Sequence, residues 1–86
     1  MVLKKDTYYG TGKEINYQGK KSNKNIEKAF DYLLDTSEIF DVTSKGNPFF
    51  QIKKLCVEVN KENATIYCTG KLEKDVIKKL EKIGKN

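Results

Sequence analysis

The 86-residue chain contains no histidine, arginine or tryptophan, and it has only one proline and two cysteines. Without histidine, general acid–base catalysis would depend on carboxylates, lysines or tyrosines whose pKa is tuned by burial. The cysteines, Cys56 and Cys68, lack CxxC spacing, which argues against both a disulfide scaffold and a zinc site. Neither thiol has a histidine to activate it. We therefore expect a protein without catalytic residues, metal or cofactor.

Long apolar runs are also missing. No stretch approaches the roughly 20 residues that span a bilayer, and residues 1–6 lack the apolar core of a signal peptide. With 37% hydrophobic and 34% charged residues, the composition fits one small domain with a thin core. We expect a cytoplasmic protein that makes no membrane contact.

All 17 basic residues are lysine, and the net charge is +5. The charge is uneven, because residues 1–24 carry +4, residues 25–47 carry −3 and residues 48–86 carry +4. Arginine, the bidentate donor used for specific contacts to guanine and phosphate, is absent. Two explanations stay open: a role for lysine in binding anions, or the codon usage of an AT-rich genome.

Residues 39–69 predict an antiparallel sheet of three strands. Residues 39–44 alternate between apolar and polar side chains, residues 45–48 form a turn cluster, and residues 49–60 and 64–69 continue as strands. Within residues 49–60 the apolar positions change from even to odd numbers. A strand of period two cannot keep both sets on one face, so we expect a bulge or bend at Lys53 and Lys54.

The apolar pattern also predicts how these strands pair, because the apolar side chains should share one face. The predicted pairs are Val42/Phe50 and Phe40/Ile52 in the first hairpin, and Val59/Ala64, Val57/Ile66 and Leu55/Cys68 in the second. In this register Cys56 faces Tyr67 on the opposite side of the sheet. The two cysteines then point away from each other and form no disulfide.

Two segments have the periodicity of amphipathic helices. The first is residues 25–36, with Ser22 or Asn23 capping its start, and the second is residues 71–83, with Gly84 as a C-terminal stop. The apolar faces are Ile26, Ala29, Phe30, Leu33 and Leu34 in the first helix and Leu72, Val76, Leu80 and Ile83 in the second, with Ile77 at its edge.

Helices with one apolar stripe should pack on a sheet with one apolar face. We therefore predict a small two-layer α+β sandwich in the order α-β-β-β-α, with both helices on one face of the meander and with residues 24–86 as the single domain. Residues 1–23 are rich in lysine, glycine and tyrosine. They predict either a hairpin, in which residues 7–9 pair with residues 14–18, or an extended arm.

The order helix, three strands, helix resembles that of the double-stranded RNA-binding domain in outline. In that family the last helix opens with a basic Lys-Lys-x-Ala-type motif, whereas Lys71-Leu72-Glu73-Lys74 has an acid in the middle and no alanine. The resemblance is one of architecture, and architecture alone does not carry function.

The leading functional hypothesis is nucleic-acid binding through phosphate contacts, with weak sequence specificity. Lysines of the second helix recur every three or four residues up to Lys85, within an arc of roughly 80° opposite the apolar stripe. In the N-terminal segment, tyrosines suited to base stacking alternate with lysines. The predicted nucleic-acid-binding residues are Lys71, Lys74, Lys78 and Lys82 near the C-terminus and Lys4, Lys5, Lys20, Lys21, Tyr8, Tyr9 and Tyr17 in the N-terminal segment. The structural alternatives are a solvated helix face and a strand pair covered by its tyrosines.

The second hypothesis is a protein-interaction module, such as a regulator or inhibitor of a larger complex. Glu27, Asp31 and Asp35 follow one another at one-turn spacing beside the apolar face of the first helix, where each like-charge pair costs about 0.2–0.5 kcal/mol. They form either a solvated face or a docking surface for a basic partner. The open face of the sheet, with Tyr67, is a second candidate surface, and the polarised charge also suits a homodimer.

Overall fold

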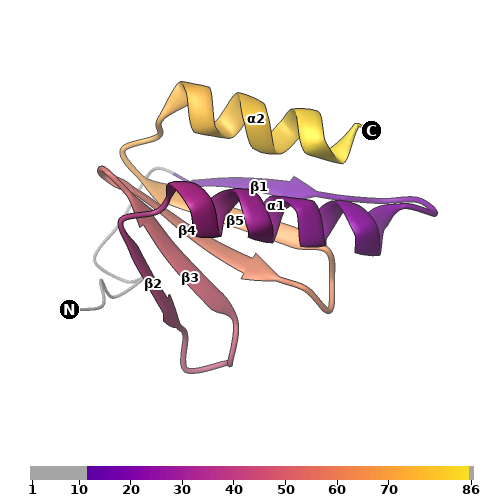
Figure 1. Cartoon of the computed structure of the whole chain (residues 1–86), viewed down its shortest axis with the longest axis horizontal. Helices are drawn as coiled ribbons and strands as arrows, with labels where there is room; N and C mark the ends of the chain where they lie inside the picture. Colours follow the sequence, from indigo (N-terminus) through magenta and orange to yellow (C-terminus); the bar gives the residue numbers. More distant parts are fainter. Residues whose placement is uncertain (1–11, 86) are drawn as a thin grey trace.

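Five strands form one antiparallel sheet, and two helices cover one of its faces, which gives a two-layer α+β fold (Figure 1). The structure is a computed structural model, and it describes residues 12–85. The elements are β1 (Gly12–Asn16), α1 (Ser22–Thr36), β2 (Ile39–Val42), β3 (Pro48–Ile52), β4 (Leu55–Asn60), β5 (Thr65–Gly70) and α2 (Lys74–Gly84). The predicted α+β class and the placement of both helices on one face are confirmed.

The number of strands and the order of the elements differ from the prediction. The sheet order is β1-β5-β4-β3-β2, so β1 pairs with β5 at one edge and β2 lies at the other. Residues 12–16 therefore belong to the sheet, whereas residues 7–9, their predicted hairpin partners, lie outside the described residues. The observed order, β-α-β-β-β-β-α, corrects the predicted α-β-β-β-α and departs from the outline of the double-stranded RNA-binding domain.

The predicted bend at Lys53 and Lys54 is a hairpin turn that separates β3 from β4. Ile52 pairs with Leu55 across these two residues, and Lys53 has a φ of +54°. Reversal across a two-residue turn pairs even-numbered with odd-numbered positions. This pairing explains why the apolar positions change parity at this point: the even set of β3 and the odd set of β4 share one face.

The predicted register of the first hairpin is wrong by two residues. Phe40 pairs with Phe50 and Val42 with Pro48. The loop begins one residue earlier than expected, because the Thr43 N–H donates to the Asn47 carbonyl (2.8 Å) and encloses residues 44–46. A shift of two residues leaves every side chain on its original face, so the apolar pattern could not distinguish the two registers.

The second hairpin is shifted in the same way. Val59 pairs with Ile66 and Val57 with Cys68. Ala64 was expected in the strand but lies in the turn, with a φ of +51°. Cys56 therefore pairs with Thr69 rather than with Tyr67. Both cysteines are buried and free, on opposite faces of the sheet as predicted.

Both helices differ from the prediction at their N-terminal ends. Helix α1 begins three residues early, at Ser22, and no described side chain caps it; α2 begins three residues late, at Lys74. Ile77 is buried in the core, whereas Val76 and Leu72 are only partly buried. Neither helix within residues 12–85 is both long enough and apolar enough to cross a membrane.

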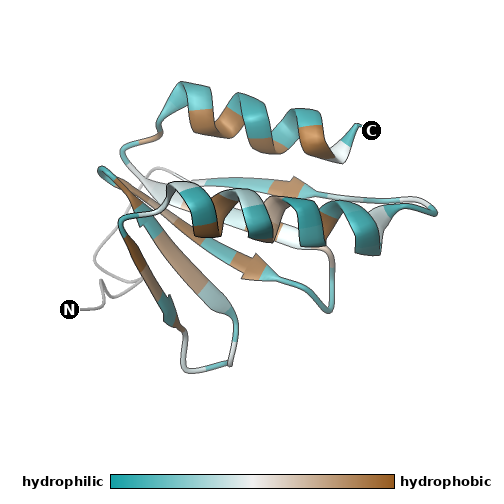
Figure 2. Cartoon of the chain, viewed as in Figure 1, coloured by the Kyte–Doolittle hydropathy of each residue, from teal (hydrophilic) through white to brown (hydrophobic). Residues whose placement is uncertain are grey.

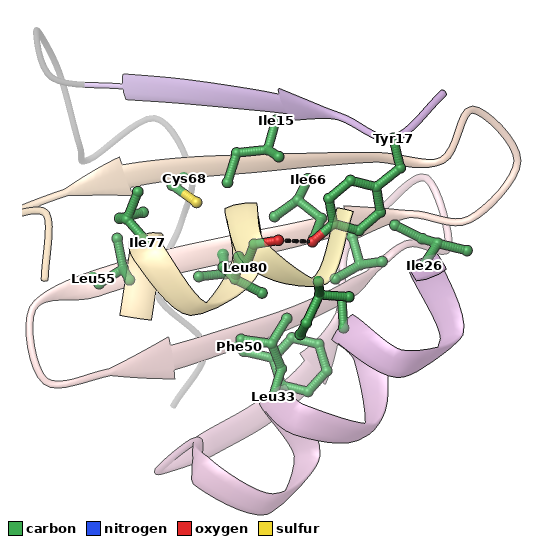
Figure 3. Close-up of a cluster of buried hydrophobic side chains, with 14 of the residues drawn as sticks. Ile15, Tyr17, Ile26, Leu33, Phe50, Leu55, Ile66, Cys68, Ile77 and Leu80 are labelled. Atoms are coloured by element: carbon green, nitrogen blue, oxygen red, sulfur yellow. Dashed lines mark hydrogen bonds between the residues drawn. The ribbon is translucent and has the colours of Figure 1, made fainter. Parts of the chain in front are cut away.

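The core lies between the two layers, where the apolar sides of the helices face the sheet (Figure 2). Its largest fully buried side chains come from both layers: Phe50, Ile26, Leu33, Leu55, Ile66 and Leu80. Tyr17, just after β1, also points into this layer, and its hydroxyl donates a hydrogen bond to the Leu80 carbonyl of α2 (Figure 3). This contact fixes the end of β1 to the C-terminal half of α2.

Candidate nucleic-acid interface

The outer side of α2 presents a row of lysines. Lys74, Lys78, Lys82 and Lys85 are exposed, because the helix buries Ile77, Leu80 and Ile83 on its opposite side. We call these four lysines the basic face. At 1.5 Å per residue, the basic face extends about 17 Å along the helix axis. The predicted lysine ridge is thus present, with Lys85 as its last member.

Within residues 12–85, neighbouring acids do not neutralise the charges of the basic face. Glu81 on the same helix forms an ion pair with Lys13 of β1 (2.9 Å), and Glu73 lies 3.6 Å from Lys53. Among the described residues, no carboxylate oxygen lies within 4.0 Å of an ammonium group of the basic face. The four ammonium groups are therefore available to bind an anion.

The connection between β1 and α1 brings two more lysines to one end of this surface. The C-terminus of α2 and this connection lie at the same end of the molecule (Figure 1). A shallow hollow of about 190 Å³ between them is lined by Ile15, Asn16, Tyr17, Glu81, Gly84 and Lys85. This volume is below the roughly 300 Å³ of a typical small-molecule site. Lys20 and Lys21 lie in this connection and are exposed.

Other predicted nucleic-acid-binding residues have different positions. Lys71 is exposed but precedes α2, where its backbone N–H donates to the Lys54 carbonyl (3.1 Å). Tyr17 is only 3% exposed, which contradicts the prediction that it stacks on bases. Its burial follows from the packing of α2 against the end of β1. The remaining predicted residues, Lys4, Lys5, Tyr8 and Tyr9, lie outside the described residues.

One exposed lysine beside the basic face was not predicted. Lys79 lies on α2 with its Nζ 6.0 Å from the centre of the Tyr32 ring. Members of the basic face are three or four residues apart. Lys79 does not fit this spacing, because Lys79 directly follows Lys78. Only the packing of α2 beside α1 shows that its side chain points toward α1.

The predicted acidic surface of α1 is also present. Asp31 and Asp35 are exposed, and within residues 12–85 neither has a lysine within 4.0 Å. Glu27 is partly compensated, because Lys61 lies 3.4 Å from its carboxylate. The ammonium of Lys61 also lies 3.9 Å from the centre of the Phe30 ring.

The second predicted docking surface lies on the face of the sheet that points away from the helices. Tyr67 is half-buried there, and Phe49, Cys56, Glu58 and Thr69 on the same face are buried. These residues alternate along their strands with the core residues, so they point away from the helices. That the face with Tyr67 is a docking surface stays a prediction.

Among the described residues, burial limits the reactivity of the Cys68 thiol. Burial raises the pKa of the Cys68 thiol to about 12, and Glu81 adds to this effect while Lys13 opposes it. The thiol therefore stays protonated at neutral pH, which makes it a poor nucleophile. Residues 12–85 hold no group of three or more cysteines and acids placed to bind a metal ion.

Comparison with known proteins found no matching family model, no matching curated protein and no matching solved structure.

Proposed function

We propose that the protein binds nucleic acid through the basic face of α2, mainly by contacts to phosphates. The observation that carries this proposal is the row of four exposed lysines with no carboxylate within 4.0 Å among the described residues. A helix without a ligand gains nothing from like charges at one-turn spacing. A polyanion would convert this repulsion into attraction.

The dimensions of the basic face suit a nucleic-acid backbone. In duplex DNA each strand places a phosphate about every 3.4 Å along the axis, so a 17 Å face spans about five phosphates of one strand. Lys20 and Lys21 would extend the contact beyond the end of α2. Lysine acts as a point charge that positions the protein without reading base edges, so sequence specificity should be weak.

The binding test is fluorescence anisotropy with labelled single-stranded and double-stranded DNA and RNA, which also determines the preferred strand type. If three lysines each contact a phosphate of a duplex, raising the salt concentration from about 50 to 200 mM should weaken binding roughly 40-fold. If none of the four ligands binds at the lower salt concentration, the basic face is only solvated surface and the proposal is wrong.

A matched pair of variants separates the basic face from net charge. Replacing Lys74, Lys78 and Lys82 with Gln should weaken binding at least tenfold and reduce the slope of log K against log salt by about 2 to 3. The control replaces Lys28, Lys45 and Lys54 with Gln, which removes the same charge from exposed positions outside the face. Equal losses in the two variants would show that overall charge, not the basic face, drives binding.

A further inference from the structure

Three exposed apolar side chains belong to the C-terminal half of α1 and to β2. Leu34, Phe40 and Val42 are 43%, 47% and 50% exposed, and they are the exposed large hydrophobic side chains of the described residues. Phe40 and Val42 project to the same side of β2, because side chains alternate along a strand. We call these three residues the apolar patch.

The apolar patch rests on a rigid base. The ring of Phe40 lies 5.0 Å from that of the fully buried Phe50 and 6.1 Å, edge-on, from that of Phe30. Phe30 and Phe50 also contact each other edge-on at 5.7 Å. One half of the Phe40 ring is thus fixed by the core while the other half is in contact with solvent.

Within residues 12–85, one edge of the strand that carries Phe40 and Val42 is unpaired. Among the described strands, β2 pairs only with β3. The Thr43 N–H donates to the carbonyl of Asn47, which directly precedes β3. In this register the backbone groups of the alternate residues, Phe40 and Val42, point away from β3. The outward N–H of Val42 donates a hydrogen bond to Oδ1 of Asp41 (2.7 Å).

The opposite edge of the sheet is protected in a way that β2 is not. On β1, Lys13 projects to the helix side and forms the ion pair with Glu81 (2.9 Å). A charged side chain that points inward at an edge strand discourages the addition of another strand. The corresponding side of β2 carries Phe40 and Val42, which would favour such an addition.

The surroundings of the apolar patch are acidic. Asp31 and Asp35 on α1, Glu38 before β2 and Asp41 on β2 have no lysine within 4.0 Å among the described residues. In addition, residues 25–47 carry a net charge of −3. An occupant of this edge should therefore carry positive charge together with apolar side chains.

A second copy of the chain does not meet these requirements. Antiparallel pairing of two β2 strands would place Asp41 and Glu38 of one copy close to the same residues of the other, and like charges across strands are destabilising. The basic face of another copy also fits poorly, because the apolar residues of α2 are buried or half-buried. A helix, moreover, cannot use the outward backbone groups of β2.

We infer that β2 is a docking edge for an extended basic segment of a partner protein, which adds to the sheet as a further strand. Alternate apolar side chains of the segment cover Leu34, Phe40 and Val42, and its lysines or arginines meet Asp35, Glu38 and Asp41. A partner carbonyl accepts the Val42 N–H in place of Asp41, whose carboxylate is then available for a basic side chain. This mode of recognition combines main-chain hydrogen bonds with side-chain specificity.

The test uses a labelled nine-residue peptide in which lysine alternates with valine, added to the intact protein. Two control peptides replace the central valines with proline, which removes strand hydrogen-bond donors, or all lysines with glutamate. We expect binding of the first peptide, with each control at least tenfold weaker. Amide exchange of Phe40 and Val42, followed by NMR, should slow in the complex, because only strand addition occupies these outward groups.

The matched variants are Val42→Lys, which places a like charge on the edge, and Gln18→Lys, which adds the same charge at an exposed position in the β1–α1 connection. Thermal unfolding of both confirms the fold. Val42→Lys should weaken peptide binding at least tenfold and Gln18→Lys less than threefold. Absence of binding at millimolar peptide, equal binding by the proline peptide, or unchanged exchange of Phe40 and Val42 would overturn the inference. Sedimentation that shows a dimer abolished by Val42→Lys would also overturn it, in favour of a second copy.

Discussion

The hydroxyl of Tyr17 donates a hydrogen bond to the main-chain carbonyl of Leu80, which joins the end of the first strand to the last helix (Figure 3). The two residues are 63 positions apart, and both are buried. Tyr17→Phe removes this hydrogen bond but keeps the ring in the core. We expect it to lower the free energy of unfolding by about 1 kcal/mol. Urea unfolding measures this change; Tyr32→Phe, at a half-exposed tyrosine, should change it by less than about 0.5 kcal/mol.

The same tyrosine explains why residue 84 is glycine. A Cβ at Gly84 would lie well inside van der Waals contact of two ring carbons of Tyr17. Helix propensity alone predicts that Gly84→Ala stabilises α2 by up to about 1 kcal/mol. We expect the opposite sign, a loss of about 1–3 kcal/mol, because the tyrosine must move.

A double-mutant cycle tests whether Tyr17 is the cause of that loss. In a Tyr17→Leu background the clash is absent, so the further change Gly84→Ala should cost much less than it does in the wild type. If Gly84→Ala stabilises the wild type, or costs the same in both backgrounds, Tyr17 is not what restricts residue 84.

Burial of Cys68 predicts a loss of stability in alkaline solution. Its pKa rises from 9.0 to about 12 in the folded protein, and burial raises the pKa of Tyr17 as well. As the pH increases above about 9, the unfolded chain releases these protons while the folded chain retains them. The free energy of unfolding should therefore be constant below pH 9 and fall toward pH 12, by up to about 1.4 kcal/mol per pH unit for each group.

Urea unfolding at pH 7 to 11 measures this dependence, and Cys68→Ala is its control. The variant is less stable at every pH because it lacks a buried side chain. Its stability should nevertheless fall less steeply than that of the wild type between pH 9 and 10, where the unfolded cysteine ionises. Identical slopes for the two proteins would show that Cys68 does not contribute.

The sequence contained enough information for the class of fold and for the basic face, because both depend on local periodicity. The lysine spacing placed Lys74, Lys78 and Lys82 on one side of α2, and the same spacing placed Leu80 and Ile83 on the other. The change of apolar parity at Lys53 also marked the right place. The pattern predicts a bulge or bend there, because a bulge and a two-residue reversal change the parity in the same way.

What could not be predicted depends on contacts between distant segments. Strand β1 contains a single core residue, Ile15, and it pairs with β5 about 50 residues later in the chain. No local pattern encodes that pairing. The burial of Tyr17 follows from it, because only the position of β1 beside β5 brings Tyr17 under α2. For the same reason, the tyrosine had looked like a surface residue suited to stacking.

In the turn between β3 and β4, unlike at the positions discussed above, we expect a substitution to raise the free energy of unfolding. Lys53 adopts a φ of +54°, a left-handed conformation that costs roughly 1 kcal/mol for a residue with a side chain. Glycine adopts it without this cost, although glycine loses more backbone entropy on folding. The ion pair of Lys53 with Glu73 is long (3.6 Å), and the lysine is largely exposed, so its loss should have little effect. We therefore expect Lys53→Gly to raise the free energy of unfolding by up to about 1 kcal/mol.

Lys54→Gly is the matched control, because Lys54 lies in the same turn without a positive φ and gains nothing from glycine. A destabilised Lys53→Gly protein, or equal effects at the two positions, would mean that the turn is not strained at Lys53.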